Sequence, residues 1–105
     1  MLTSKQIVEL ADAAARIDRG SLTKAGRALQ KHGNRPNSAF PKPFGNIAII
    51  NRAGQNVVND ILTNPSSQID TRQTKRFGKV TEIRAPDGRG IRYDNTGSFI
   101  GFLEP

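Results

Sequence analysis

A single histidine and a set of basic residues are the side chains of this sequence best suited to chemistry. His32 stands in the run Lys31-His32-Gly33-Asn34-Arg35, and an imidazole pKa of about 6.5 suits proton transfer near neutral pH. Cations beside such a group can stabilise the negative charge that develops on a phosphate. RNA cleavage needs little more, because the 2′-hydroxyl of RNA supplies the nucleophile. A histidine that merely caps the end of its helix is an equally good interpretation.

The charge of the chain is positive and unevenly distributed. The 105 residues carry a net charge of +7, and residues 21–59 contain six basic side chains and no acidic one. Such an excess indicates an anionic partner, which is a nucleic acid, an acidic protein or a membrane surface. The basic helix expected in this region has only a thin apolar side, so we expect no membrane binding.

The sequence also lacks the residues that several kinds of site require. It has no cysteine and one histidine, which leaves too few ligands for the common zinc sites. No motif of a phosphate-binding Walker loop, a zinc protease, an α/β-hydrolase or a calcium loop occurs. We therefore expect no metal and no cofactor.

Further candidates for a site follow in the last third of the chain. Four basic residues could bind phosphate groups: Arg72, Lys75, Arg76 and Arg92. Thr71 or Thr74 could offer a hydroxyl to a phosphate. Glu82 could act as a base, or it could pair with Arg84 or Arg92. Tyr93 shares the alternation phase of Ile91, which favours a place in the core.

Helical spacing of apolar residues predicts the elements that position these candidates. A capping box at Thr3 and Gln6 begins a helix over residues 4–19, which Gly20 ends. A second helix is expected from Ser21 or Thr23 to about His32. A third helix, with the widest apolar stripe, follows Asn46 and stops at 64–65.

Gly54 and the proline-rich residues 34–45 carry two further expectations. Gly54 lies inside the third helix, and close packing against a neighbouring element would explain it. Residues 34–45 contain three prolines and are expected to form a loop, with Phe40 and Phe44 packed into the core. A loop of this length is either functional or a plain connector.

Residues 66–105 alternate apolar and polar side chains with a period of two, which predicts strands. Turn residues at 73–76, 87–90 and 94–97 divide them into a four-stranded antiparallel meander. One face is apolar and needs the helices as a cover, and the other face is charged and is expected to stay open. The sequence thus predicts one α+β domain over 1–105, with an N-terminal helix in 1–20, helices and a loop in 21–64, and the sheet in 66–105.

Three segments resemble C-terminal toxin domains of bacterial contact-dependent growth inhibition and polymorphic toxin systems: SLTKAGRALQKHG, GQNVVNDILTNP and RFGKVTEIRAPDGRGIRYDNTGSFIGFLEP. The similarity covers about residues 20–105. These domains are similar to the barnase/EndoU/colicin/RelE ribonucleases, which implies N-terminal helices packed on one face of a four-stranded antiparallel sheet. The resemblance implies a metal-independent endoribonuclease that cuts RNA, with tRNA as the expected substrate, by attack of the 2′-hydroxyl.

The resemblance also implies partners and a place of action. Such a domain is the C-terminal part of a larger secreted effector and acts in the cytoplasm of the target cell. A cognate immunity protein is expected to neutralise it, and this partner is acidic if it masks the basic face. A host protein factor is a further partner that the resemblance allows. The alternative is a non-catalytic module that binds RNA or protein through its basic face.

Within the recognised motifs, the resemblance directs attention to Lys24, Arg27, Lys31, His32, Arg76, Arg92 and Tyr93, whereas Arg35, Arg72, Thr74 and Lys75 are candidates for their charge or hydroxyl alone. Those that we expect to be catalytic are Lys31, His32, Arg76, Arg92 and Tyr93. Those that we expect to bind RNA are Lys24, Arg27, Arg35, Arg72, Thr74 and Lys75. One histidine cannot be both members of an acid–base pair. A lysine, an arginine, Tyr93 or Glu82 must therefore take part in proton transfer, or the 2′-hydroxyl must be activated mainly by charge stabilisation.

Overall fold

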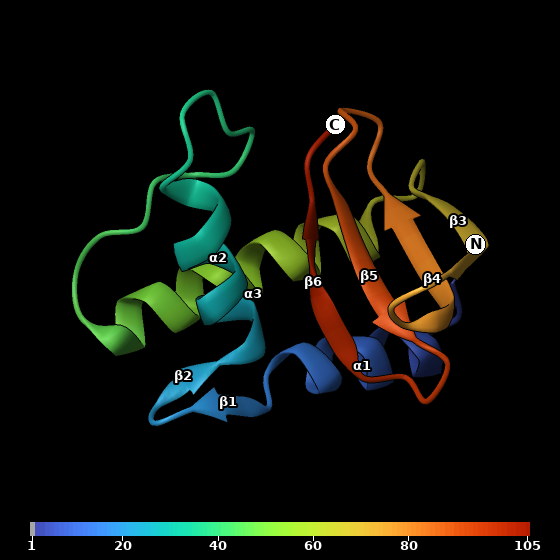
Figure 1. Ribbon diagram of the computed structural model, residues 1–105, viewed down its shortest axis with the longest axis horizontal. Coiled ribbons are helices and arrows are strands. Elements are labelled where there is room, and N and C mark those ends of the chain that lie inside the picture. Colours follow the sequence, from blue (N-terminus) through green and yellow to red (C-terminus); the bar gives the residue numbers. More distant parts are fainter. Residues whose placement is uncertain (1) are drawn as a thin grey trace.

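Three helices precede a four-stranded antiparallel sheet in the computed structural model, which describes residues 2–105 (Figure 1). The first part of the chain forms α1 (Ser4–Ala14), β1 (Ile17–Arg19), β2 (Leu22–Thr23), α2 (Lys24–Gly33) and α3 (Ile47–Thr63). The sheet follows as β3 (Gln68–Thr74), β4 (Gly78–Arg84), β5 (Gly90–Asp94) and β6 (Phe99–Leu103). None of the helices in the described residues is long and apolar enough to cross a membrane.

The sheet is the predicted meander, with its strands in the order β3-β4-β5-β6. Ile83 lies opposite Ile91, and Glu82 lies opposite Arg92. The turns that join β4 to β5 and β5 to β6 contain Gly88 at φ 90° and Gly97 at φ 88°. Glycine adopts such positive φ values at little steric cost, which is why these tight turns form where the sequence predicted them.

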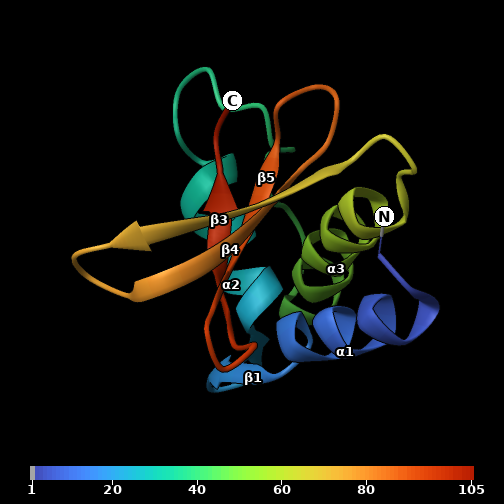
Figure 2. The same ribbon diagram turned by 90° about the vertical axis from the view of Figure 1, so that its right-hand side faces the viewer.

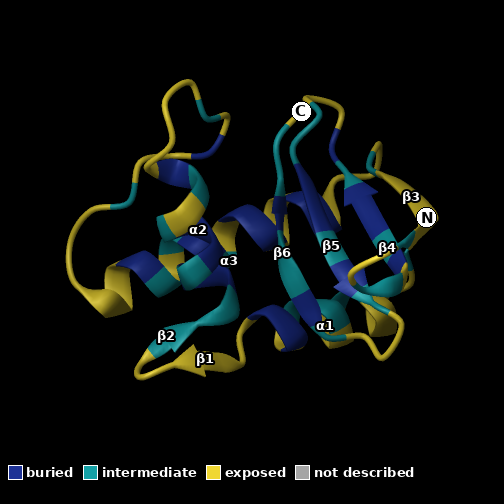
Figure 3. Ribbon diagram, in the orientation of Figure 1, coloured by how far each residue is buried: buried dark blue, intermediate teal, exposed yellow. Residues whose placement is uncertain are grey.

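One face of the sheet is covered by α1 and α3, which lie on the same side of it (Figure 2). Buried stretches run along α3, β4 and β5 (Figure 3). Val58 and Ile61 of α3 are fully buried in one cluster with Ile83 and Ile91 of the sheet. The wide apolar stripe of α3 therefore closes the core, as predicted, and the α+β fold class is confirmed. Phe40 is buried in the same cluster.

The second helix lies elsewhere, because α2 packs on α3 and beside the edge strand β6 (Figure 1). Its contact with α3 is close, since a Cβ atom at Gly54 would lie 2.4 Å from the carbonyl oxygen of Ala25. Only glycine fits at that crossing, which confirms the expectation of close packing at this residue. The edge position of α2 leaves space between its polar side and the sheet.

Two expectations about local structure were wrong. The first helix ends at Ala14 instead of continuing to residue 19, and β1 and β2 form a short antiparallel hairpin after it. The pairing of Ile17 with Thr23 competes with the helix, and Ile17 remains 59% exposed. Phe44 does not pack into the core, because it is 78% exposed.

The second face of the sheet is less open than expected. Val80 and Glu82 point away from α1 and α3, yet they are only 0% and 4% exposed. Arginine side chains lie over the Glu82 carboxylate, which explains how a charged group is buried on this face. A buried carboxylate needs such partners, because an unpaired one would be strongly destabilising.

Candidate active site

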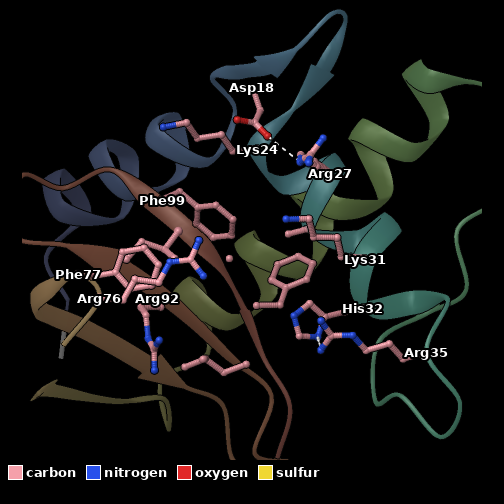
Figure 4. Close-up of a pocket in the computed structure, with 15 residues that line it drawn as sticks. Asp18, Lys24, Arg27, Lys31, His32, Arg35, Arg76, Phe77, Arg92 and Phe99 are labelled. Atoms are coloured by element: carbon pink, nitrogen blue, oxygen red, sulfur yellow. Dashed lines mark hydrogen bonds and ion pairs between the residues drawn. The ribbon is translucent and has the colours of Figure 1, made fainter. Parts of the chain in front are cut away.

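A basic cleft with a volume of about 550 Å³ opens between α2 and the sheet (Figure 4). This volume lies within the range of roughly 300–1,000 Å³ that is typical of ligand sites. Among residues 2–105, the lining contains one carboxylate, that of Asp18, and six basic side chains besides His32: Lys24, Arg27, Lys31, Arg35, Arg76 and Arg92. The excess of positive charge makes the cleft attractive to a polyanion.

The helix α2 forms one wall of the cleft. The side chain of Thr23 caps its first turn by accepting a hydrogen bond from the Gly26 amide at 2.9 Å. Lys24, Arg27 and Lys31 recur at helical spacing on the polar side, whereas the apolar side is buried against α3. This division directs a row of positive charges towards the cleft.

His32 is held at the end of this row by a residue from the far end of the chain. Its Nδ1 atom lies 2.8 Å from Oε2 of Glu104, and the imidazole side chain is only 12% exposed. The guanidinium Nη1 of Arg35 lies 3.4 Å from the same Nδ1. Nδ1 can donate to the carboxylate or accept from the guanidinium, but it cannot do both. The shorter contact to a carboxylate assigns the proton to Nδ1 and leaves Nε2 as the acceptor of the neutral ring.

The loop after α2 fixes Glu104 in turn. Its carboxylate accepts hydrogen bonds from the Ser38 hydroxyl at 2.8 Å and from the Ala39 amide at 3.0 Å. The partly buried position by itself raises the pKa of the Glu104 carboxyl, but these bonds and the contact with His32 outweigh burial and lower the pKa below its usual value. The Glu104 carboxyl is therefore ionised at neutral pH.

The close approach of that loop depends on Gly33. A Cβ atom at this residue would lie 2.2 Å from the carbonyl oxygen of Pro41, so a larger residue would push the loop away. The loop also brings the ring of Phe40 within 5.4 Å of the His32 ring, between ring centroids, and Phe102 of β6 lies 6.1 Å from it. Residues 34–45 therefore help to position the histidine, so they are more than a plain connector.

The backbone of the C-terminal segment is anchored on the sheet. Arg84 donates from Nη1 to the carbonyl oxygen of Glu104 at 3.2 Å and to that of Gly88 at 2.8 Å. Glu104 is thus held through its carbonyl oxygen by the sheet and through its side chain by the loop. This double attachment limits the motion of the carboxylate that faces His32.

The opposite wall of the cleft contains Arg92, whose position is set by Glu82. The Nε and Nη2 atoms of Arg92 lie 3.0 and 2.6 Å from Oε2 of Glu82, and Nη1 of Arg72 lies 3.7 Å from Oε1. Of the partners suggested by the sequence, Glu82 therefore pairs with Arg92. This pairing fixes the orientation of the Arg92 guanidinium, and the side chain of Arg92 still lines the cleft.

The residues singled out in the sequence fall into two groups. Seven of them line the cleft: Lys24, Arg27, Lys31, His32, Arg35, Arg76 and Arg92. Arg72, Lys75, Thr74 and Tyr93 do not. Arg72 and Lys75 are exposed, and the Thr74 hydroxyl is used within its own turn, where it accepts from the Phe77 amide at 3.0 Å and donates to the Gly78 carbonyl at 2.9 Å.

Tyr93 lies on the other side of the sheet, with the core. It is 1% exposed, and its hydroxyl donates to the carbonyl oxygen of Leu10 at 2.8 Å. Burial raises the pKa of the phenol, so the hydroxyl stays protonated. We therefore leave Tyr93 out of the proposed site.

Two residues of the candidate site were missed in the sequence: Glu104, which contacts His32 without lining the cleft, and Phe77, which lines it. Glu104 is an isolated acid in the last segment, and its partner His32 lies 72 residues earlier, so no local pattern connects them. Phe77 lines the cleft and carries the guanidinium of Arg76 above its ring. The adjacent Arg-Phe pair in a predicted turn was the available signal. Within the described residues, no group of three histidine, aspartate or glutamate side chains is placed to bind a metal.

Comparison with known proteins identifies the family and supports the fold. Residues 11–104 match the family described as the CdiA C-terminal tRNase toxin domain. A crystal structure of the toxic C-terminal tip of CdiA from Pseudomonas aeruginosa, in complex with immune protein, is similar in fold and sequence. Its TM-score is 0.74 and its identity 27%, over 87% of this chain and 98% of that chain. A search of curated protein sequences finds no match.

Proposed function

Because the chain belongs to the family of CdiA C-terminal tRNase toxin domains, we propose that the basic cleft is the site at which this toxin cleaves tRNA. One observation carries the proposal, namely that Glu104 orients His32 on the wall of a cleft lined by six other basic side chains. An oriented imidazole supplies the proton transfer, and the cations supply the charge stabilisation that phosphodiester cleavage requires.

The proposed chemistry starts at Nε2 of His32, the ring nitrogen that does not contact Glu104. Nε2 of His32 accepts the proton of the 2′-hydroxyl, and the 2′ oxygen forms a bond to phosphorus. The bond from phosphorus to the 5′ oxygen breaks, and the ammonium of Lys31, on the same wall, gives that oxygen its proton. The products are a 2′,3′-cyclic phosphate and a 5′-hydroxyl. The Glu104 carboxylate stabilises the imidazolium as it forms.

Arg92 is the residue that binds the scissile phosphate in this mechanism. Its guanidinium, oriented by Glu82, lies on the opposite wall, where it can hold the non-bridging oxygens of the phosphate. Fixed cations at this position stabilise the additional negative charge of the transition state and need no metal ion. Lys24, Arg27 and Arg35 extend the positive surface along α2 for the flanking phosphates.

The partners and delivery of the toxin belong to the same proposal. The Pseudomonas aeruginosa tip is seen with an immune protein, and we infer that a cognate immunity protein neutralises this domain by covering the cleft. Its contact surface is acidic, because the surface that it covers is basic. The domain is the C-terminal part of a larger secreted effector and acts on tRNA in the cytoplasm of the target cell.

The test is incubation of the purified domain with total bacterial tRNA, with and without EDTA and with and without cell extract. We expect discrete fragments that end in a 2′,3′-cyclic phosphate and that form equally well with EDTA. Loss of cleavage on addition of EDTA would contradict the metal-independent mechanism. Intact tRNA under all four conditions would leave a binding module as the alternative.

The first variant to test is His32→Ala. It should lower the rate of cleavage by about 10²–10⁴-fold, which is the usual contribution of a positioned acid or base. Lys79→Ala is the matched control, because Lys79 is an exposed cation of β4 that does not line the cleft. Thermal unfolding should show both variants folded. Full cleavage by His32→Ala would remove the histidine from the mechanism.

A further inference from the structure

The turn between β3 and β4 places an aromatic ring and a guanidinium group together on the wall of the cleft that faces α2 (Figure 4). The Cζ atom of Arg76 lies 5.0 Å from the centre of the Phe77 ring. Phe77 is half-buried and Arg76 is exposed, so the guanidinium is the outer member of the pair. This arrangement presents a flat cationic surface, backed by an aromatic ring, to whatever enters the cleft.

The turn is built to hold this pair in place. The Thr74 hydroxyl accepts from the Phe77 amide at 3.0 Å and donates to the Gly78 carbonyl at 2.9 Å. Gly78 has φ 68°, a left-handed conformation that a larger residue would adopt only at a cost. The hydrogen bonds and the glycine fix the turn before a ligand arrives, so little conformational entropy is lost on binding.

The chemistry of the pair identifies its ligand. Proteins recognise unpaired RNA bases by stacking them on aromatic rings or on the planes of arginine guanidinium groups. Resting on the proposed function, we propose that Arg76 and Phe77 form a base-stacking subsite for the nucleobase next to the scissile phosphate. The cleft then binds an unpaired segment of RNA, with the phosphate between Lys31 and Arg92 and the neighbouring base on Arg76.

This assignment differs from a phosphate contact in a way that can be measured. A phosphate contact needs charge, which lysine also has, whereas stacking needs the planar guanidinium, which lysine lacks. A phosphate contact is also indifferent to the base. Arg76→Lys and removal of the base therefore separate the two roles.

The experiment uses octamers of 2′-O-methyl uridine, which cannot be cleaved, and octamers of the same backbone without bases. Binding is measured by fluorescence anisotropy for the wild type, Phe77→Ala, Arg76→Lys and the Lys79→Ala control. Stacking is worth roughly 1–3 kcal/mol per base, which is about 5- to 150-fold in affinity. We expect Phe77→Ala and Arg76→Lys to lose that factor for the uridine octamer and to bind the abasic octamer like the wild type.

Other results would overturn the subsite. These are equal losses for both octamers, a uridine affinity of Arg76→Lys equal to that of the wild type, or no preference of the wild type for the octamer with bases. The tRNA assay separates this failure from failure of the proposed function. A domain that cuts tRNA but shows no stacking preference keeps the function and loses the subsite, whereas a domain that cuts no tRNA loses the function whatever the octamers show.

Discussion

The sheet has a cleft on each side, of nearly equal volume and opposite character. The basic cleft beside α2 has a volume of about 550 Å³, and a second cleft, between α1 and the sheet, has about 510 Å³. The lining of the second combines apolar side chains, such as Leu10, Ile69 and Ile83, with polar ones, and its charged residues are Glu9, Lys79 and Asp94, so it has no excess of positive charge. Volume alone therefore does not identify the site in this molecule. We assign the proposed site from the side chains that line each cleft, because of these two clefts only the basic one gathers cations around an oriented histidine.

The strand β5 shows how the two clefts acquire different linings. Successive side chains of a strand point to opposite faces, so Arg92 lines the basic cleft and Tyr93 lines the second one. Cations on one surface repel one another. Two of the six basic side chains that line the cleft have an ion-pair partner, Arg27 with Asp18 at 3.2 Å and Arg92 with Glu82 at 2.6 Å, so the compensation is incomplete. Such uncompensated charge lowers the stability of the free protein, and binding of a polyanion relieves it. Because Arg92 and Tyr93 are adjacent in β5 and line different clefts, substitutions at these two residues test the comparison directly.

The largest expected effect on this comparison is that of Arg92→Ala. Removal of a fixed cation from the transition state should lower the rate of tRNA cleavage by about 10²–10³-fold. It also leaves the buried Glu82 carboxylate with only the more distant Arg72, so the free energy of unfolding should fall as well. Cleavage kinetics and urea unfolding measure the two effects.

A double variant separates the two effects of Arg92. Glu82→Gln combined with Arg92→Gln removes both charges, so the stability should recover towards that of the wild type while cleavage stays impaired. If the double variant regained cleavage, Arg92 would matter only for the structure of the sheet. The distinction between a reactive and a structural face would then rest on His32 alone.

The parts of the fold that were predicted correctly depend on local patterns. The period of two in 66–105 and the turn residues at Gly88 and Gly97 predicted the meander, and the apolar stripe of α3 predicted the cover. The failure at residues 15–19 has a physical reason. The helical spacing of apolar residues continues to Ile17, but pairing of Ile17 with Thr23 decides the structure, and that pairing is visible only in three dimensions.

The candidate site likewise has a part that local sequence patterns predict and a part that they do not. The row of cations on α2 was predictable, because it follows from helical spacing within one segment. The contact of His32 with Glu104 was not, because it joins the end of α2 to the last segment of the chain. The exposure of Phe44 and the use of Thr74 within its own turn were likewise decided by the path of the loops, for which the sequence offers no periodic signal.

Glu104→Gln should have the next largest effect, because the amide keeps the shape of the side chain and loses its charge. A hydrogen bond to a charged group is worth about 1.5–3 kcal/mol, so cleavage should fall by about 10- to 100-fold. His32→Ala should make the Glu104 substitution silent, since both residues act through the same imidazole. Independent losses in the double variant would contradict a positioning role for Glu104.

The same variant predicts a dependence of stability on pH. The pKa of Glu104 is lowered in the folded protein from the ordinary value of 4.5. A lowered folded-state pKa contributes stability that is fully present above pH 4.5 and is lost as the pH falls through the folded-state pKa. The gap in melting temperature between wild type and Glu104→Gln should thus be constant at neutral pH and narrow below pH 4.5. A gap that persists unchanged in acid would mean that the charge of Glu104 does not stabilise the fold.

The smallest expected effect belongs to Tyr93→Phe, one residue from Arg92 and on the other side of the sheet. The change removes the hydrogen bond to the Leu10 carbonyl and leaves the ring in the core, so the free energy of unfolding should fall by about 0.5–1.5 kcal/mol. The rate of tRNA cleavage should stay that of the wild type, because the phenol does not line the basic cleft. A stable Tyr93→Phe protein that cleaved poorly would connect the apolar side of the sheet to the chemistry. Unchanged cleavage together with reduced stability, beside impaired cleavage and near-normal stability in the Glu82→Gln/Arg92→Gln variant, would show that one residue along a single strand separates the structural face from the reactive one.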